Sequence, residues 1–187
     1  MDISELMEQY VTATINCEKL KQAERTAHDN YMRAKVILNE GRTDLVSPEF
    51  IEECLNAEKK AKDELKSAND ILDFIYQTYE AACTSMTLQE AIESKELADK
   101  RYQKNSQKYY ELDRQKEGLN YAGKKYEQEY GYQVALSFYQ KSAEYKEEMK
   151  ELEPIIQVYK NFAGSLNKLV EKKKNSETKQ NTGVSIK

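Results

Sequence analysis

The chain has 187 residues, of which 33% are charged and 39% apolar, and its mean hydropathy is −0.90. Six glycines and two prolines supply too few turns for an all-β fold, and the apolar content is too high for a disordered polymer. The net charge of −4 and the scarcity of Arg argue against a dedicated nucleic-acid binder. These values are typical of long helices with narrow buried faces, and we expect one domain over residues 1–171.

Charge is distributed unevenly along the chain. Residues 1–96 carry 11 basic and 20 acidic side chains, whereas residues 97–187 carry 18 and 13. We interpret the two halves as complementary solvated faces, within one bundle or between chains. The alternative is a basic second half that meets an acidic partner, a phosphate or an anionic lipid.

The three cysteines form no CxxC pair, and Cys17 and Cys54 fall on apolar positions of the helical pattern. No apolar run is long enough to cross a bilayer, and the chain opens without a signal peptide. We therefore expect a soluble protein of a reducing, intracellular compartment, the cytoplasm.

The first two helices are predicted to form an antiparallel hairpin over residues 3–84. Apolar residues alternate in steps of three and four over residues 3–40, and Gly41 follows in the usual place for a left-handed residue. Ser47 and Pro48 then restart the helix, as N-cap and first helical residue. The short connection between two helices of similar length predicts that they lie side by side.

A long third segment, residues 88–171, begins after a Thr87–Glu90 capping box. Glycines at 118 and 123 could form a turn there, but the apolar steps keep their phase through this stretch, which favours a continuous helix. The same phase persists across Pro154 and predicts a kink rather than an end. Residues 172–187 lack apolar periodicity and are predicted to be a disordered tail.

These elements predict an all-α fold, an elongated antiparallel helical bundle or coiled coil of three to four long helices. A continuous third helix would extend beyond the hairpin and need a second subunit to cover its apolar face. The sequence thus predicts a homodimer, whereas a turn at 118–123 would allow a four-helix bundle within one chain.

The sequence contains few residues and motifs that could support catalysis. The single histidine, His28, is expected to be exposed beside the apolar stripe. It shares a face with Glu24, but this pair cannot complete a metal site. Phosphate-binding and dinucleotide-binding glycine motifs are absent, as is a nucleophile elbow. We predict no enzymatic activity, no metal and no cofactor.

Fourteen tyrosines and no tryptophan are the most unusual feature of the composition. Most of the tyrosines on the long stripe are interpreted as buried residues whose hydroxyls reach the edge of the core. Four that lie off the stripe are the candidates for a protein-binding face: Tyr110, Tyr121, Tyr132 and Tyr139.

The functional prediction is a non-enzymatic helical interaction protein, a scaffold, adaptor or inhibitor that binds protein partners through its helix faces. The alternative is a membrane-surface module, because a hairpin followed by a long kinked helix resembles BAR-type dimers in layout. No BAR family motif accompanies that layout, and the first helix pair is acidic, so a membrane surface is not favoured.

Overall fold

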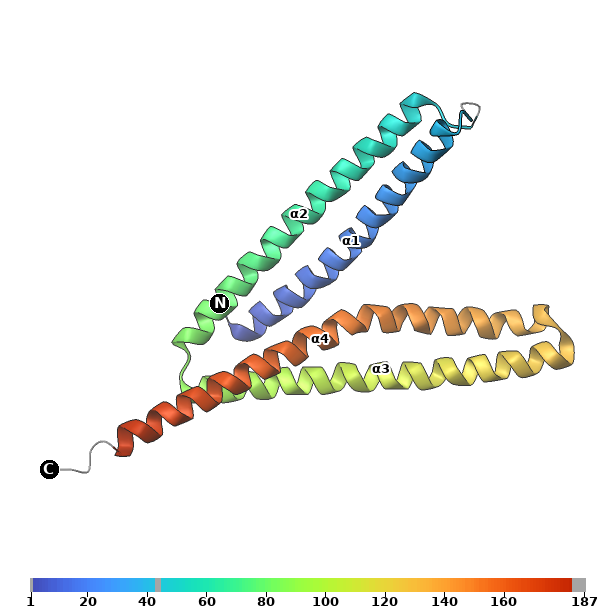
Figure 1. The fold of residues 1–187 in the computed structure, drawn as a ribbon. Coiled ribbons are helices and arrows are strands. Elements are labelled where there is room, and N and C mark those ends of the chain that lie inside the picture. Colours follow the sequence, from blue (N-terminus) through green and yellow to red (C-terminus); the bar gives the residue numbers. More distant parts are fainter. Residues whose placement is uncertain (1, 43–44, 183–187) are drawn as a thin grey trace. The chain divides into compact units, whose positions relative to one another are not determined.

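The computed structural model describes residues 2–42 and 45–182, with side chains as far as Thr178. Over these residues it contains four helices and no strand: α1 (Ile3–Asn39), α2 (Pro48–Ser85), α3 (Leu88–Tyr130) and α4 (Tyr132–Thr182) (Figure 1). The predicted all-α helical bundle is confirmed. Contacts divide the chain into two compact units, Glu8–Tyr79 and Met1–Met7 with Glu80–Lys187. The single domain expected over residues 1–171 stays a prediction.

Local capping signals set the helix boundaries as the sequence predicted. Gly41 ends α1 with φ at +73°, in the left-handed region that favours glycine. Ser47 Oγ accepts a hydrogen bond from the Phe50 amide at 3.2 Å, before α2 begins. Thr87 and Glu90 form the reciprocal capping box at the start of α3. These boundaries follow from residues within a few positions of each helix end.

In the Glu8–Tyr79 unit α1 and α2 run antiparallel side by side (Figure 1). The rings of Tyr10 and Tyr76 lie 5.8 Å apart, and farther along the pair His28 contacts Glu58. Between the helices Cys17 is buried as a small apolar residue. The other buried apolar residues of this unit are Val11, Ala34, Val46, Ala68 and Tyr79.

In the other unit α3 and α4 run antiparallel along most of their length (Figure 1). Three hydrogen bonds, spaced along the hairpin, define how α3 and α4 are aligned: Arg101 with Tyr159, Tyr109 with Glu153 and Asn120 with Ser142. Between these contacts the core contains Leu112, Met149 and Leu152. Alanines 91, 98 and 135 are fully buried, so the helix backbones can approach closely.

The turn between α3 and α4 corrects the predicted third segment. Helix α3 passes through residues 118–123 unbroken, as the phase of the stripe favoured. The prediction of one continuous helix over residues 88–171 is wrong, because α3 ends at Tyr130 and Gly131 follows as its cap. Gly131 has φ 87° and ψ 164°, a conformation essentially restricted to glycine. Its amide donates to the Glu127 carbonyl at 2.9 Å, and its own carbonyl accepts from Val134 at 3.2 Å. A single residue therefore separates the two helices.

The end of α4 also differs from the prediction. The helix includes Pro154, as the phase of the stripe indicated, and the kink there stays a prediction. It then continues to Thr182, so a disordered tail from residue 172 is wrong for residues 172–182. Lys, Glu and Gln are good helix formers, and they extend the helix after its apolar face has ended. Residues 183–187 of the predicted tail lie outside the described residues.

None of the described helices combines the length and the apolarity needed to cross a membrane. The sequence expectation that no segment spans a bilayer is consistent with this finding.

Candidate functional site

The four predicted tyrosines occupy different parts of the α3–α4 hairpin. Tyr110 and Tyr121 lie on α3, 71% and 76% exposed, about 16 Å apart along the helix. Tyr132 is the first residue of α4 and Tyr139 lies about two turns further on, with their rings stacked 6.2 Å apart. The structure thus brings Tyr132 and Tyr139 together, while Tyr110 lies well away along the hairpin.

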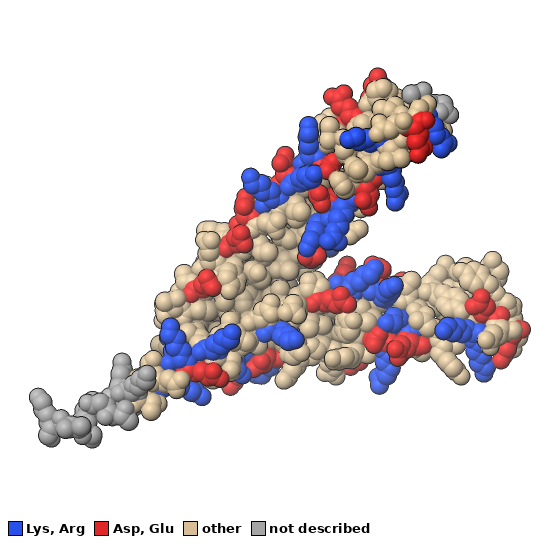
Figure 2. Space-filling model, in the orientation of Figure 1, with Lys and Arg blue, Asp and Glu red and all other residues tan. Residues whose placement is uncertain are grey.

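Aromatic side chains gather around the Gly131 turn. Tyr126 stacks on Phe138 at a centroid distance of 5.0 Å and lies 5.8 Å from the ring of Tyr130. Figure 2 shows uncharged surface at this end of the hairpin, bordered by charged side chains. We call this group the aromatic tip, and its members are Tyr126, Tyr130, Tyr132, Val134, Phe138 and Tyr139.

Three exposed residues of the aromatic tip are not among the four candidates that the sequence offered. Tyr126, Tyr130 and Val134 follow one another in steps of four along the apolar stripe of the third segment, which is expected to be buried, yet they are 40%, 63% and 49% exposed. The stripe shows which face of a helix is apolar, but not how far the partner helix covers it. The signal that could have found them is Gly131, which interrupts the stripe between Tyr130 and Val134.

Tyr139 is held in place within the tip. Its hydroxyl donates to Glu127 Oε2 at 2.6 Å, and this bond raises the pKa of the Tyr139 phenol. On its other side the ring packs against the backbone of Gly123, where an added Cβ would lie 2.8 Å from Tyr139 Cε1. Gly123 is therefore a glycine inside a helix at a place where the neighbouring helix approaches too closely for a side chain.

We expect Gly123→Ala and Gly118→Ala to differ in free energy of unfolding by about 1–3 kcal/mol. Both gain the helix propensity of alanine over glycine, about 1 kcal/mol. Only the alanine at 123 collides with the Tyr139 ring, since the added Cβ at 118 meets nothing within 4 Å. Urea denaturation followed by circular dichroism measures both variants. Equal stabilisation of the two would show that the Tyr139 ring moves away freely.

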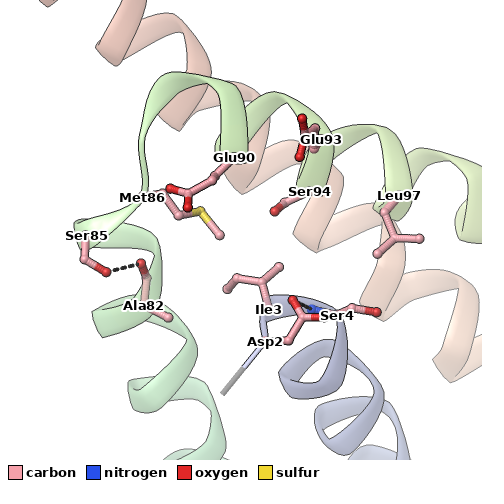
Figure 3. Close-up of a pocket in the computed structure, with 10 residues that line it drawn as sticks. All are labelled: Asp2, Ile3, Ser4, Ala82, Ser85, Met86, Glu90, Glu93, Ser94 and Leu97. Atoms are coloured by element: carbon pink, nitrogen blue, oxygen red, sulfur yellow. Dashed lines mark hydrogen bonds between the residues drawn. The ribbon is translucent and has the colours of Figure 1, made fainter.

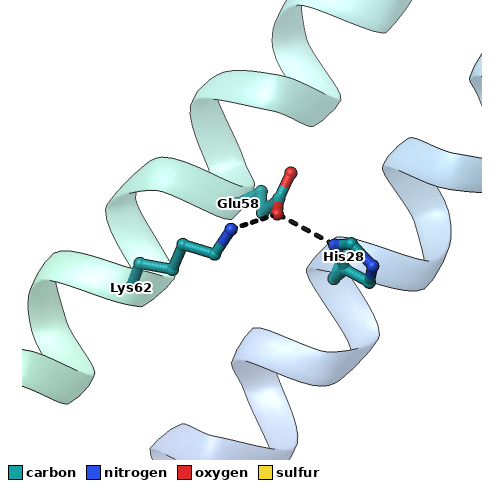
Figure 4. Close-up of polar contacts among 3 residues, drawn as sticks. All are labelled: His28, Glu58 and Lys62. Carbon is teal, nitrogen blue, oxygen red and sulfur yellow. Dashed lines mark hydrogen bonds and ion pairs between the residues drawn. The ribbon is translucent and has the colours of Figure 1, made fainter.

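The histidine belongs to a polar cluster in the α1–α2 hairpin (Figure 4). His28 Nδ1 lies 2.9 Å from Glu58 Oε1, and Lys62 donates to the same oxygen. The Glu58 side chain is only 6% exposed, and its bonds with Lys62 and His28 lower the pKa of its carboxyl group. His28 is exposed, as predicted, and its partner is Glu58. Because Glu58 Oε1 joins His28 of α1 to Lys62 of α2, we interpret this cluster as a structural bond between the two helices.

Metal ligands do not converge in the part of the chain that is described. No group of three His, Cys, Asp or Glu side chains there could hold a metal ion. The sequence prediction that no metal is bound stays a prediction.

A hollow of about 450 Å³ lies where the first residues of α1 meet the end of α2 and the start of α3 (Figure 3). Ile3, Met86 and Leu97 face this space. Its carboxylates are occupied by neighbours: Asp2 accepts from the Ser4 amide, Glu90 closes the capping box and Glu93 accepts from Gln89. The polar groups of this hollow thus serve the helix ends, and the aromatic tip is the stronger candidate site.

Comparison of the chain with family models, curated proteins and solved structures finds no match in any of the three.

Proposed function

We propose that this chain is a non-enzymatic helical interaction protein that binds a protein partner through the aromatic tip. The observation that carries this proposal is the uncovered part of the apolar stripe. Tyr126, Tyr130 and Val134 continue the face that α3 and α4 bury elsewhere, but here the side chains meet solvent. Exposed apolar surface of this kind marks interaction sites, and tyrosine is enriched among residues that dominate binding energy.

The rings of the tip contact one another or a neighbouring side chain. Tyr139 is fixed by Glu127 and by its stack with Tyr132, and Tyr126 is fixed by Phe138. Such rings lose little conformational entropy when a partner covers them. The fixed positions of these rings therefore support the proposal that the aromatic tip binds a protein partner.

The membrane alternative loses the layout on which it rested. It required a hairpin followed by one long third helix, whereas the chain turns at Gly131 and forms a second hairpin from α3 and α4. The prediction of a homodimer rested on the same continuous helix. The experiment below distinguishes a membrane contact and a homodimer interface from binding of a different protein.

The test begins with a photo-crosslinking residue at position 130, used in an extract of cells that naturally express the chain. Adducts are identified by mass spectrometry, and the identified partner is purified. We expect Tyr130→Ser with Tyr132→Ser to weaken its binding at least tenfold, because two exposed aromatic anchors are removed.

The matched control replaces two exposed apolar residues of α2, Ile71→Ser with Phe74→Ser, which are 57% and 69% exposed. This pair should leave the affinity unchanged, and circular dichroism should show equal helicity in all variants. If the Tyr130/Tyr132 variant binds the identified partner as tightly as the parent does, the proposal is wrong. A crosslink only to a second copy would make the tip a homodimer interface. Co-sedimentation with anionic vesicles, lost in the same variant, would make it a membrane contact.

A further inference from the structure

A second feature of the α3–α4 hairpin lies well away from the tip. It is a pocket of about 280 Å³ between the two helices, lined from α3 by three tyrosines and a serine and from α4 by three further residues. The α3 residues are Tyr102, Ser106, Tyr109 and Tyr110, and those of α4 are Glu153, Ile156 and Gln157. Positions 102, 106, 109 and 110 recur on one helix face, so the rings converge on one space.

The aromatic walls of the pocket have defined orientations. The rings of Tyr109 and Tyr110 are perpendicular, at 88° and 6.1 Å between centroids. Tyr109 and Ile156 also pack against the core cluster of α3 and α4, which gives the pocket a firm floor. Tyr110 is 71% exposed, so the pocket opens to solvent on that side. Faces of tyrosine rings attract cations through their quadrupole.

The polar groups of the pocket are mainly acceptors. Glu153 Oε1 accepts from the Tyr109 hydroxyl at 3.2 Å, and the carboxylate has capacity for further donors. Gln157 donates through Nε2 to Asn161, which leaves its carbonyl oxygen as an acceptor. Ser106 Oγ is buried and has no hydrogen-bond partner among the described residues. A ligand with several N–H donors would satisfy these groups together.

Among the residues that line the pocket, only Glu153 is charged. No lysine or arginine lines the pocket, and Lys108 and Lys116 of α3 pair with Glu148 and Asp113. Burial raises the pKa of the Tyr109 phenol, and the adjacent Glu153 raises it further. Both the charge and the rings therefore favour a cationic ligand.

We propose that this pocket binds the guanidinium group of an arginine side chain presented by another protein. The planar group stacks on the tyrosine rings, pairs with Glu153 and donates to Ser106 Oγ and Gln157. Guanidinium fits better than ammonium because it carries five donors in a plane and stacks on aromatic faces. A pocket smaller than about 300 Å³ suits a side chain better than a drug-sized molecule.

This inference rests on the proposed function only in taking its ligand from a protein chain. The pocket and the aromatic tip share no residue, so either can fail while the other stands.

The test titrates the full chain with Nα-acetyl-arginine amide and follows the tyrosine ring signals by NMR. We expect saturable binding with a dissociation constant on the order of 1 mM, typical of one small group. The uncharged isostere Nα-acetyl-citrulline amide should bind at least tenfold more weakly. Equal binding of the two amides would overturn the proposal, because the positive charge of the guanidinium group would then contribute nothing to binding.

Two variants locate the binding. Tyr110→Leu removes an exposed ring and should weaken arginine amide binding about three- to tenfold, and Glu153→Gln should weaken it about tenfold. The matched control is Tyr121→Leu, an equally exposed tyrosine on the same helix, which should bind as the parent does. An unchanged affinity in both pocket variants would overturn the assignment of the site.

Two further probes test the chemical class. Nα-acetyl-lysine amide and choline chloride each supply a cation without the planar donor set. Weaker binding of both supports a guanidinium site. Equal or tighter binding of either would overturn the arginine assignment and leave a general cation site.

Discussion

Gly131→Ala is expected to destabilise the chain by about 1–3 kcal/mol, although alanine is the better residue inside a helix. The reason is the backbone conformation at the turn, φ 87° and ψ 164°, in which a Cβ is strained even where nothing lies within 4 Å of it. The free energy of unfolding from urea denaturation measures this cost. Gly118→Ala is the control of opposite sign, because that glycine is helical and unobstructed.

The same substitution is also expected to increase the dimeric fraction. Tyr126, Tyr130 and Val134 are spaced as in one helix, so a chain relieved of the glycine conformation can continue α3 directly into α4. The contacts between α3 and α4 would then be recovered with a second copy, as in domain swapping. Light scattering should show a larger share of mass near twice 21.8 kDa than in the parent. An unchanged distribution together with unchanged stability would show that the turn tolerates a side chain.

Leu166→Ala is expected to have the larger effect on stability, about 2–5 kcal/mol. Leu166 is on α4 and is 0% exposed, among the largest fully buried side chains of the chain. Its truncation removes buried apolar surface and leaves a cavity that close-packed neighbours fill only in part. Urea denaturation followed by far-UV circular dichroism measures the loss.

The control for this prediction is Leu45→Ala, which deletes the same atoms from a leucine that is 54% exposed. We expect that variant to stay within about 0.5 kcal/mol of the parent. A similar loss in both variants would mean that burial at position 166 does not decide the effect.

Helix formation and most helix boundaries were predictable because their causes are local. The period of apolar residues, the Ser47 N-cap, the Thr87–Glu90 capping box and the left-handed Gly41 all act within a few residues. The same local reasoning predicted the all-α class, which the structure confirms. It also identified Tyr132 and Tyr139 as candidates, which the structure brings together.

The path of the second half was decided by packing between distant residues. Glycines occupy positions 118, 123 and 131, and the apolar steps keep their phase past all three, so the pattern alone does not show which of them ends a helix. Gly118 and Gly123 both stay helical, and the Tyr139 ring of α4 occupies the space of the side chain that Gly123 lacks, whereas Gly131 takes a conformation that other residues avoid. The position of α4 antiparallel to α3 shows that the turn lies at Gly131.

The sequence by itself therefore determined that the chain is helical, where α1 ends and where α2 and α3 begin, and which faces are apolar. Tertiary structure alone decided how much of each apolar face is covered. Tyr126 and Tyr130 continue the stripe of Leu112, yet Leu112 is buried and the two tyrosines at the turn are exposed. A periodic pattern records the direction in which side chains point from one helix, and burial depends in addition on a second helix that arrives from elsewhere in the chain.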